Sequence, residues 1–187
     1  MHERRRALGM TRTAGRRQES AFARVREPLD LPSHLPYQLV HASSMLSVGF
    51  ARLLNRRFRI GIREWRILAV LGHGGPMAPS DLVGRAAYDK GTVSRALQRL
   101  ERRGLVRRVP AGPGRQRWIV GLTAEGAALH DRIAPLARMR ARILQAVLDP
   151  EEARVLERAL DRLITKIAWL NEEERSDLAA LSDPETR

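Results

Sequence analysis

The apolar residues of the chain recur at helical spacing over most of its length. Between Leu35 and Leu53 they lie three or four positions apart, and small serines occupy the other side of this segment. A helix with so little charge is typical of a segment enclosed by other elements. A shorter segment with the same spacing follows at Ile62–Leu71, and the glycines and proline of residues 72–76 end it. A short third helix is predicted at Pro79–Ala87, because Pro79 and Asp81 are favourable in the first turn of a helix.

The segment Lys90–Arg103 predicts an amphipathic helix with two contrasting sides. Val93, Leu97 and Leu100 form one narrow apolar seam when each residue is turned by about 100°. Asp89 is placed to cap the start of this helix. The side opposite the seam carries Gly91, Arg95, Gln98, Arg99 and Arg102.

Two predicted strands follow Gly104, which is placed to end the preceding helix. The strands are Leu105–Val109 and Gln116–Thr123, and a turn rich in proline and glycine joins them. Arg115 and Arg117 lie near the tip of this hairpin. A helix-turn-helix followed directly by a hairpin is a winged helix, whose second helix enters the DNA major groove while the hairpin lies along the neighbouring backbone or minor groove.

The C-terminal third is predicted to be helical. Thr123 can cap a helix over Ala124–Leu148, and a last helix extends from about Glu151 to Asn171. Apolar residues step by three and four along this last helix, as in a coiled-coil seam. The seam consists of Ala153, Leu156, Leu160, Leu163, Ile167 and Leu170.

The charge of the chain is concentrated in its middle third. The 187 residues include 34 basic and 21 acidic side chains, which gives a formal net charge of +13. Residues 52–117 contribute 16 of the basic and only 4 of the acidic side chains, whereas residues 118–187 contribute 10 and 13. A local positive field of this size is typical of a surface that binds a polyanion.

Composition and motifs exclude several classes of function. The chain has no cysteine, which excludes disulfides, cysteine-ligated zinc and thiolate chemistry. Its five histidines share no metal-binding spacing, and no nucleophile elbow is present, so we expect no metal, no cofactor and no catalytic residue. Prolines and histidines interrupt the charge-free stretch at residues 31–51, and no apolar run follows Arg16 and Arg17. We therefore expect a cytoplasmic protein without membrane contact.

The order of these elements and their local residues resemble the MarR family of bacterial transcriptional regulators over about residues 35–171. The most specific likeness is Asp89–Arg108, which is similar to the family's recognition helix and the "LE-x-x-GLV-x-R" strand that follows it. Trp65–Leu71 and the wing exit Val120–Gly126, similar to "V-x-LT-x-x-G", support the resemblance. The chain departs from the family at the wing tip, where Gly114 replaces the usual aspartate of an Asp-x-Arg motif.

The resemblance implies a homodimer that binds double-stranded DNA. The first helix and the last two helices would interlock, and two winged-helix lobes would lie over successive major grooves of a pseudo-palindromic operator, with half-sites roughly 34 Å apart. Members of the family are most often repressors. Many bind small aromatic acids or phenols in a crevice between the dimerisation and DNA-binding lobes, and this binding releases DNA.

These features together predict a fold that is mainly α with a small β-hairpin wing. Residues 61–123 would form the winged helix-turn-helix lobe, and residues 31–60 and 124–172 a helical dimerisation region. The basic tail at residues 1–30 has no apolar run or helical period, so we expect it to be disordered. The acidic tail at residues 173–187 is expected to be frayed.

DNA contacts are expected from the arginine-rich helix side, from the start of that helix and from the wing. Arginine and glutamine can read guanine and adenine edges with two hydrogen bonds. Backbone N–H groups at a helix start attract phosphates, and short polar side chains there can add to the contact. The expected DNA-binding residues are Ser80, Lys90, Gly91, Thr92, Ser94, Arg95, Gln98, Arg99, Arg102, Arg115 and Arg117.

Two further sets of residues follow from family position and from the seam. An effector crevice would be lined by His41, Ser44, Met45 and Trp65. The dimer would be held by Leu39, Leu156, Leu160, Leu163, Ile167 and Leu170.

Two other functions are open to the same sequence. A nucleoid-type protein could coat DNA with little regard to sequence, using the basic helix side and the arginine-rich tail. An enzyme with a histidine-based site would need turnover that is lost when a histidine is replaced by alanine. Footprinting separates the first of these from a regulator, because only a regulator protects an inverted repeat.

Overall fold

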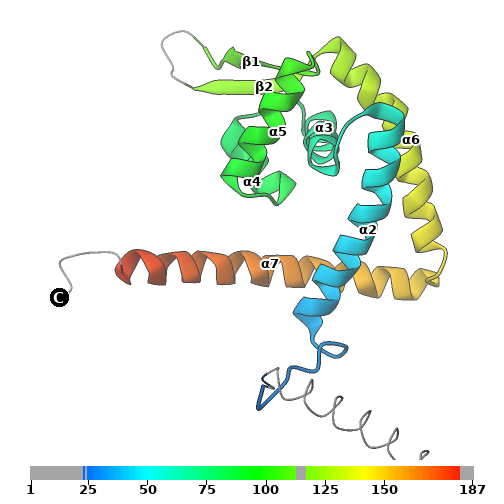
Figure 1. Cartoon of the computed structure of the whole chain (residues 1–187), viewed down its shortest axis with the longest axis vertical. Coiled ribbons are helices and arrows are strands. Elements are labelled where there is room, and N and C mark those ends of the chain that lie inside the picture. The colour runs from blue at the N-terminus through cyan, green and yellow to red at the C-terminus, as the bar shows by residue number, and fades with distance from the viewer. Residues whose placement is uncertain (1–22, 24, 113–116, 182–187) are drawn as a thin grey trace, which may run out of the picture. The chain divides into compact units, whose positions relative to one another are not determined.

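The computed structural model describes residue 23 and residues 25–112 and 117–181, with side chains described through residue 173. The chain divides into two compact units, one ending at Leu53 and the other beginning at Leu54. Helix α2 (Leu35–Phe58) spans this boundary. The elements that follow, all in the second unit, are α3 (Ile62–Gly74), α4 (Pro79–Ala86), α5 (Lys90–Arg102), β1 (Val106–Pro110), β2 (Trp118–Leu122), α6 (Ala124–Gln145) and α7 (Pro150–Leu181) (Figure 1).

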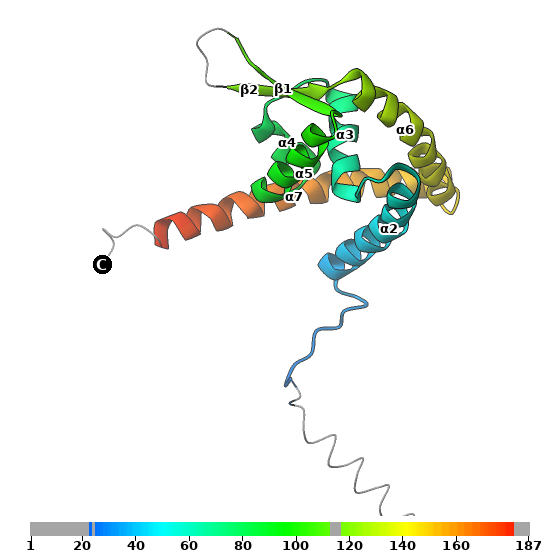
Figure 2. The same cartoon turned by 45° about the horizontal axis from the view of Figure 1, so that its top comes forward.

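The predicted winged helix is confirmed in the second unit. Helices α3, α4 and α5 pack together, and the antiparallel hairpin lies beside them (Figures 1 and 2). The hairpin pairs Val106 with Leu122 at its base and Pro110 with Trp118 toward its tip. Met77, between α3 and α4, adds a backbone bridge to Val120, which ties the helices to the wing.

One apolar core joins the helices and the wing. It includes the seam of α5 that the sequence predicted, together with side chains of α2, α3, α4, β2 and α6. The most completely buried large side chains are Leu54, Ile67, Leu68, Leu82, Leu97, Leu100, Val120 and Ile133. Burial of this seam leaves the polar side of α5 facing outward.

The ends of α5 and the start of α6 are capped as the sequence predicts. The Asp89 carboxylate accepts a hydrogen bond from the Thr92 backbone N–H at 2.8 Å. Gly104, with φ of 66°, closes the other end, and the Leu105 N–H donates back to the Leu100 carbonyl at 2.9 Å. Thr123 caps α6 by accepting from the Gly126 N–H at 3.0 Å.

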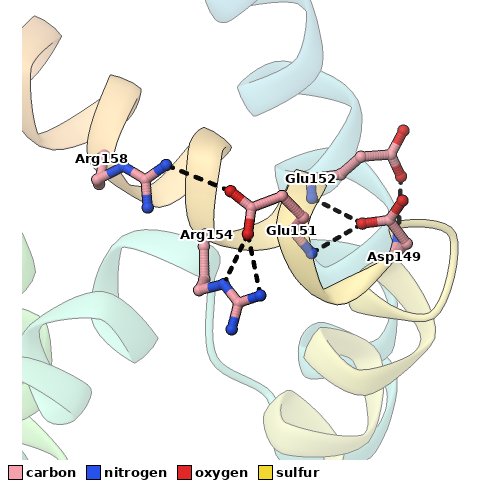
Figure 3. A network of polar contacts seen from close by, with 5 residues as sticks. All are labelled: Asp149, Glu151, Glu152, Arg154 and Arg158. Carbon is pink, nitrogen blue, oxygen red and sulfur yellow. Dashed lines mark hydrogen bonds and ion pairs between the residues drawn. The ribbon is translucent and has the colours of Figure 1, made fainter.

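Helix α7 begins with a network of charged side chains (Figure 3). The Asp149 carboxylate accepts from the backbone N–H groups of Glu151 and Glu152, each at 2.8 Å, and Glu152 accepts in return from the Asp149 N–H. This reciprocal arrangement is a capping box. Glu151 also forms ion pairs with Arg154 and Arg158, at 2.9 and 3.6 Å. The start of α7 is therefore fixed at Pro150.

The end of α7 differs from the sequence expectation. The last helix extends to Leu181, ten residues beyond its predicted end at Asn171, whereas fraying of residues 173–187 stays a prediction. The reason for the longer helix is that residues 173–181 contain no glycine or proline and are rich in glutamate, alanine and leucine, which favour helix. Helix α6 differs in the other direction, because Ala146–Leu148 form turns after its last residue, Gln145.

The predicted N-terminal tail lies largely outside the described residues, as does the segment from residue 182 onward. Among the helices that the structure describes, none combines the length and apolar character that crossing a membrane would require.

Candidate nucleic-acid interface

Helix α5 separates an apolar side from a polar side along its whole length. Val93, Leu97 and Leu100 are each at most 2% exposed. The residues that project away from this core and are exposed are Lys90, Ser94, Arg95, Gln98, Arg99 and Arg102. Gly91, on the same side as these residues, is half-buried. The exposed side is thus built from donors that suit an anionic partner.

Thr92 belongs to the cap of α5 and not to its outer side. It is only 9% exposed, and its N–H is held by Asp89. Its hydroxyl accepts a hydrogen bond from Nη2 of Arg95 at 3.2 Å. Thr92 therefore has a role in fixing the helix start, and its contact with DNA stays a prediction.

The Arg95 side chain lies back toward the start of α5. Besides its hydrogen bond to Thr92, its Nη1 atom would lie 3.2 Å from a Cβ added at Gly91. The absence of a side chain at Gly91 therefore makes room for the guanidinium. Rotation of the Arg95 side chain away from Gly91 would bring the guanidinium out toward a ligand.

The helix cap also perturbs an ionisable group. Hydrogen bonds from the Thr92 side chain and backbone lower the pKa of Asp89 below its ordinary value of 3.8, because they stabilise the ionised carboxylate. The nearby Arg95 guanidinium lowers this pKa further. The ionised cap is thus the form that the fold favours.

The variant Asp89→Asn is expected to lose less stability in acid than the parent protein. Because the pKa of Asp89 is lower in the folded state, its ionised form stabilises the fold above about pH 4, and this contribution disappears as the pH falls further. Asparagine keeps an oxygen that can accept from Thr92 but does not titrate. Melting temperatures at pH 6 and pH 3 check this expectation; equal decreases in both proteins would contradict it.

The guanidinium of Arg99 forms an ion pair within the protein. Its Nη1 atom lies 3.1 Å from Oε1 of Glu64, a residue of α3 that is only 7% exposed. Glu64 also accepts from the Gly61 backbone N–H at 2.7 Å, so its carboxylate is occupied on both oxygens. The ion pair gives Arg99 a role in joining α5 to α3, which the sequence expectation of a base contact did not include.

A groove with a polar rim lies between α4, α5 and β1. Its volume is about 470 Å³, and its floor is apolar, with Val83, Val93 and Leu97. The polar residues along its lining are Ser80, Lys90, Ser94 and Arg108. Three of these were expected from the sequence, and the groove brings them together.

Arg108 is a candidate that the sequence analysis missed. It lies on β1, opposite Val120 across the hairpin, and its Nε atom is 2.7 Å from Oε1 of Glu101 at the end of α5. This ion pair joins the wing to α5. The motif "LE-x-x-GLV-x-R" contains both residues, and the helix turn at Gly104 is the signal that brings them together.

The wing tip is described only in part. Arg115 lies outside the described residues, so its position is not part of the site geometry. Arg117 is exposed, and its backbone carbonyl accepts from the Ala111 N–H at 2.7 Å, next to the strand end. The described part of the wing therefore presents a basic side chain to solvent.

The residues expected in the dimer seam lie on helices with exposed apolar side chains. Leu39, Leu160 and Leu163 are half-buried. Leu156, Ile167 and Leu170 are exposed by 45%, 45% and 44%. Among the side chains described in α7, from Pro150 to residue 173, none is buried. Such an apolar surface is typical of a helix that packs against another chain.

The residues expected around an effector lie in different parts of the chain. His41, Ser44 and Met45 are exposed on α2, where His41 stacks on Tyr37 with ring centroids 5.6 Å apart. Trp65 on α3 is buried and stacks on His130 of α6, also at 5.6 Å. The crevice that would join them stays a prediction.

Comparison with known proteins identifies the family. The sequence model of the MarR family matches residues 60–117, which include α3, α4, α5 and β1. The HTH-type transcriptional regulator FarR of Neisseria gonorrhoeae is 30% identical over 125 residues, which cover 67% of this chain and 85% of FarR. The chain belongs to the MarR family.

Two other MarR-related proteins are similar over most of their length. The homoprotocatechuate degradative operon repressor of Escherichia coli is 27% identical over 118 residues, which cover 63% of this chain and 80% of the repressor. The solved structure of NadR in complex with 4-hydroxyphenylacetate is 26% identical, with a TM-score of 0.62, and covers 76% of this chain and 97% of NadR.

Membership of the MarR family defines the class of function. MarR proteins are dimeric, DNA-binding transcriptional regulators and not enzymes. Helix α5 is the second helix of the helix-turn-helix, the recognition helix that enters the major groove in winged-helix proteins.

Proposed function

We propose that the protein represses transcription as a homodimer that places its two α5 helices in adjacent major grooves of a pseudo-palindromic operator. The observation that carries this proposal is the position of Arg95, Gln98 and Arg102. All three are exposed on the side of α5 opposite its buried seam. Their long donor-bearing side chains can form paired hydrogen bonds with guanine and adenine edges.

Contacts to the DNA backbone would position the recognition helix. Ser80, Lys90, Ser94 and Arg108 meet along one groove, where hydroxyl, ammonium and guanidinium donors suit phosphate oxygens. Half-buried Gly91 allows the backbone at the helix start to approach a phosphate. Arg117, and Arg115 by its place in the sequence, would extend these contacts along the wing.

Dimerisation would use the exposed apolar side chains of the helices outside the winged lobe. We assign this role to Leu39 and to the seam of α7. Removing a large apolar side chain from water contributes about 1.5–3 kcal/mol. An α7 seam of this kind can therefore support a stable interface when a second copy covers it.

We further propose that a small aromatic acid releases the operator. NadR binds 4-hydroxyphenylacetate, and the Escherichia coli relative represses an operon for degradation of homoprotocatechuate, which supports a ligand of this chemistry. We assign its binding to His41, Ser44, Met45 and Trp65.

A regulator of chromosomal genes acts in the compartment that contains the DNA, so we propose a cytoplasmic location.

The variant Arg95→Ala tests the proposed base contact. We expect it to lower affinity for the operator by about 1–3 kcal/mol and to reduce discrimination against other sequences, because a bidentate contact is lost. Arg117→Ala is the matched control, since loss of a backbone contact weakens all sequences evenly. Binding isotherms on operator and random duplexes measure both effects.

Footprinting of the parent protein on genomic fragments first locates the operator. Protection of an inverted repeat, released on addition of 4-hydroxyphenylacetate as the probe ligand, is the expected result. Uniform protection with a steep salt dependence would instead indicate a protein that coats DNA. Equal losses on both duplexes for Arg95→Ala would contradict base reading by this residue.

A further inference from the structure

We infer that Arg103 is a positioning residue that fixes the recognition helix α5 to the junction between α2 and α3, and that it does not contact DNA. The inference rests on the proposed binding of α5 in the major groove. Arg103 directly follows Arg102, one of the proposed base-reading residues, and both are exposed. The two side chains nevertheless have different surroundings.

The guanidinium of Arg103 binds two backbone carbonyls at the end of α2. Its Nη1 atom donates to the Arg59 carbonyl at 2.6 Å, and its Nη2 atom donates to the Phe58 carbonyl at 3.3 Å. The last carbonyls of a helix lack partners within the helix and carry the negative end of its dipole. A planar fork of N–H donors can bind two such oxygens at once, whereas an ammonium group is a point charge.

The backbone at this junction has a conformation that needs support. Arg59 has φ of 54°, in the left-handed region that residues other than glycine seldom adopt, and its N–H still donates to the Asn55 carbonyl at 3.1 Å. Such a conformation is unfavourable for residues other than glycine and persists where surrounding contacts hold it. Ile60, which is 3% exposed, anchors the next position in the core. Arg103 binds the carbonyl of the strained residue itself.

A second arginine of α5 contacts the other end of the same junction, through Glu64. Arg99 lies one helical turn before Arg103, on the same side of the helix. Its ion pair with Glu64 reaches Gly61, because the Glu64 carboxylate also binds the Gly61 N–H. The junction from Phe58 to Gly61 is therefore held at both ends by α5.

The basic and polar side chains of α5 therefore have two different roles. Arg95, Gln98 and Arg102 face outward, whereas Arg99 and Arg103 fix the angle at which α5 is presented. Because α2 ends at this junction, the hydrogen bonds of Arg103 connect the last residue of α2, Phe58, and the following Arg59 to α5. The inference thus assigns to Arg103, together with Arg99, the attachment of the recognition helix to the junction from Phe58 to Gly61.

Affinity measured across a series of salt concentrations tests this inference. We compare the parent with Arg103→Ala, Arg103→Lys and Arg102→Ala on operator and random duplexes. A positioning role predicts that Arg103→Ala weakens operator binding about tenfold, equivalent to the loss of one charge-assisted hydrogen bond, with less than about a twofold effect on random DNA. The slope of log affinity against log salt concentration should stay unchanged, because no phosphate contact is lost.

Arg103→Lys separates a positioning role from a role of charge alone. Lysine keeps the positive charge but cannot bind both carbonyls in a fixed plane, so it should behave like the alanine variant on the operator. Arg102→Ala should lower operator affinity without freeing the junction. Hydrogen exchange in the DNA-free protein should therefore rise several-fold at the amides of residues 58–62 in Arg103→Ala and stay unchanged in Arg102→Ala.

Three outcomes would overturn the inference. An equal loss of affinity on both duplexes, with a salt slope smaller by about 0.9, would make Arg103 a phosphate contact. A lower melting temperature with unchanged preference for the operator would limit Arg103 to stabilising the fold. Unchanged exchange at the junction would contradict the contact itself. Failure of the parent protein to prefer any operator would instead contradict the proposed function, and the exchange measurement still decides the role of Arg103.

Discussion

Replacing Gly126 with alanine should destabilise the fold by at least about 3 kcal/mol. A Cβ atom at this position would overlap the carbonyl oxygen of Leu105 and would lie 2.9 Å from its carbonyl carbon. Neither partner can move freely, because the Leu105 carbonyl accepts from the Thr123 N–H at 3.1 Å and the Gly126 N–H is bound by the Thr123 hydroxyl. The substitution therefore breaks the cap of α6 or displaces Leu105, the residue before β1.

Gly84→Ala is the matched control for this prediction. Gly84 lies inside α4, and a Cβ added there would meet nothing within 4 Å. Alanine in a helix interior is favoured over glycine by about 0.5–1 kcal/mol, so this variant should be slightly more stable than the parent. Urea unfolding measures both changes. Equal unfolding midpoints for Gly126→Ala and the parent would show that the α6 start can separate from Leu105.

The variant Leu160→Asp should convert the dimer to monomers at micromolar concentration and abolish operator binding. Leu160 is half-buried at the middle of the α7 seam, which contains both half-buried and exposed apolar side chains. A carboxylate enclosed in an apolar interface would lack a partner, and burial of an unpaired charge is more costly than the interface contact it replaces. Separate monomers also lose the gain in affinity that a dimer obtains by binding both half-sites at the same time.

Arg162→Asp introduces the same side chain on the opposite side of α7, where Arg162 is exposed. It should leave the dimer intact. Sedimentation velocity of both variants and the parent measures the oligomeric state directly. A dimer in Leu160→Asp would rule out this seam as the interface and move the assignment to the other exposed apolar residues of α2 and α6.

The elements of the lobe were predictable because their signals are local. Asp89, Gly104 and Thr123 act through backbone groups within a few residues, and these caps were found where the sequence placed them. The buried seam of α5 also follows from spacing alone. In each case the signal lies within a few residues along one helix, and it predicts where the helix begins or ends and which side is buried.

The roles of the arginines were not predictable in the same way. Helical spacing places Arg95 and Arg99 on the same basic side, yet only Arg99 meets a buried carboxylate, which lies 35 positions earlier in the chain. Arg103 likewise depends on partners brought close by packing, the carbonyls of Arg59 and Phe58, whereas Arg108 meets Glu101 through the turn at Gly104. The sequence showed Gly126 as part of a motif. The structure gives the reason for a glycine there, because the backbone of Leu105 leaves no room for a Cβ atom.

The capping box at Asp149 determines more than where α7 begins. It fixes the rotational phase of the helix, because each residue added after the cap would turn all later side chains by about 100°. The apolar row from Leu156 to Leu170 would then point elsewhere, although every side chain in it would be unchanged. In a symmetric dimer, the number of residues between the cap and the row would therefore determine the direction in which the row faces the second copy.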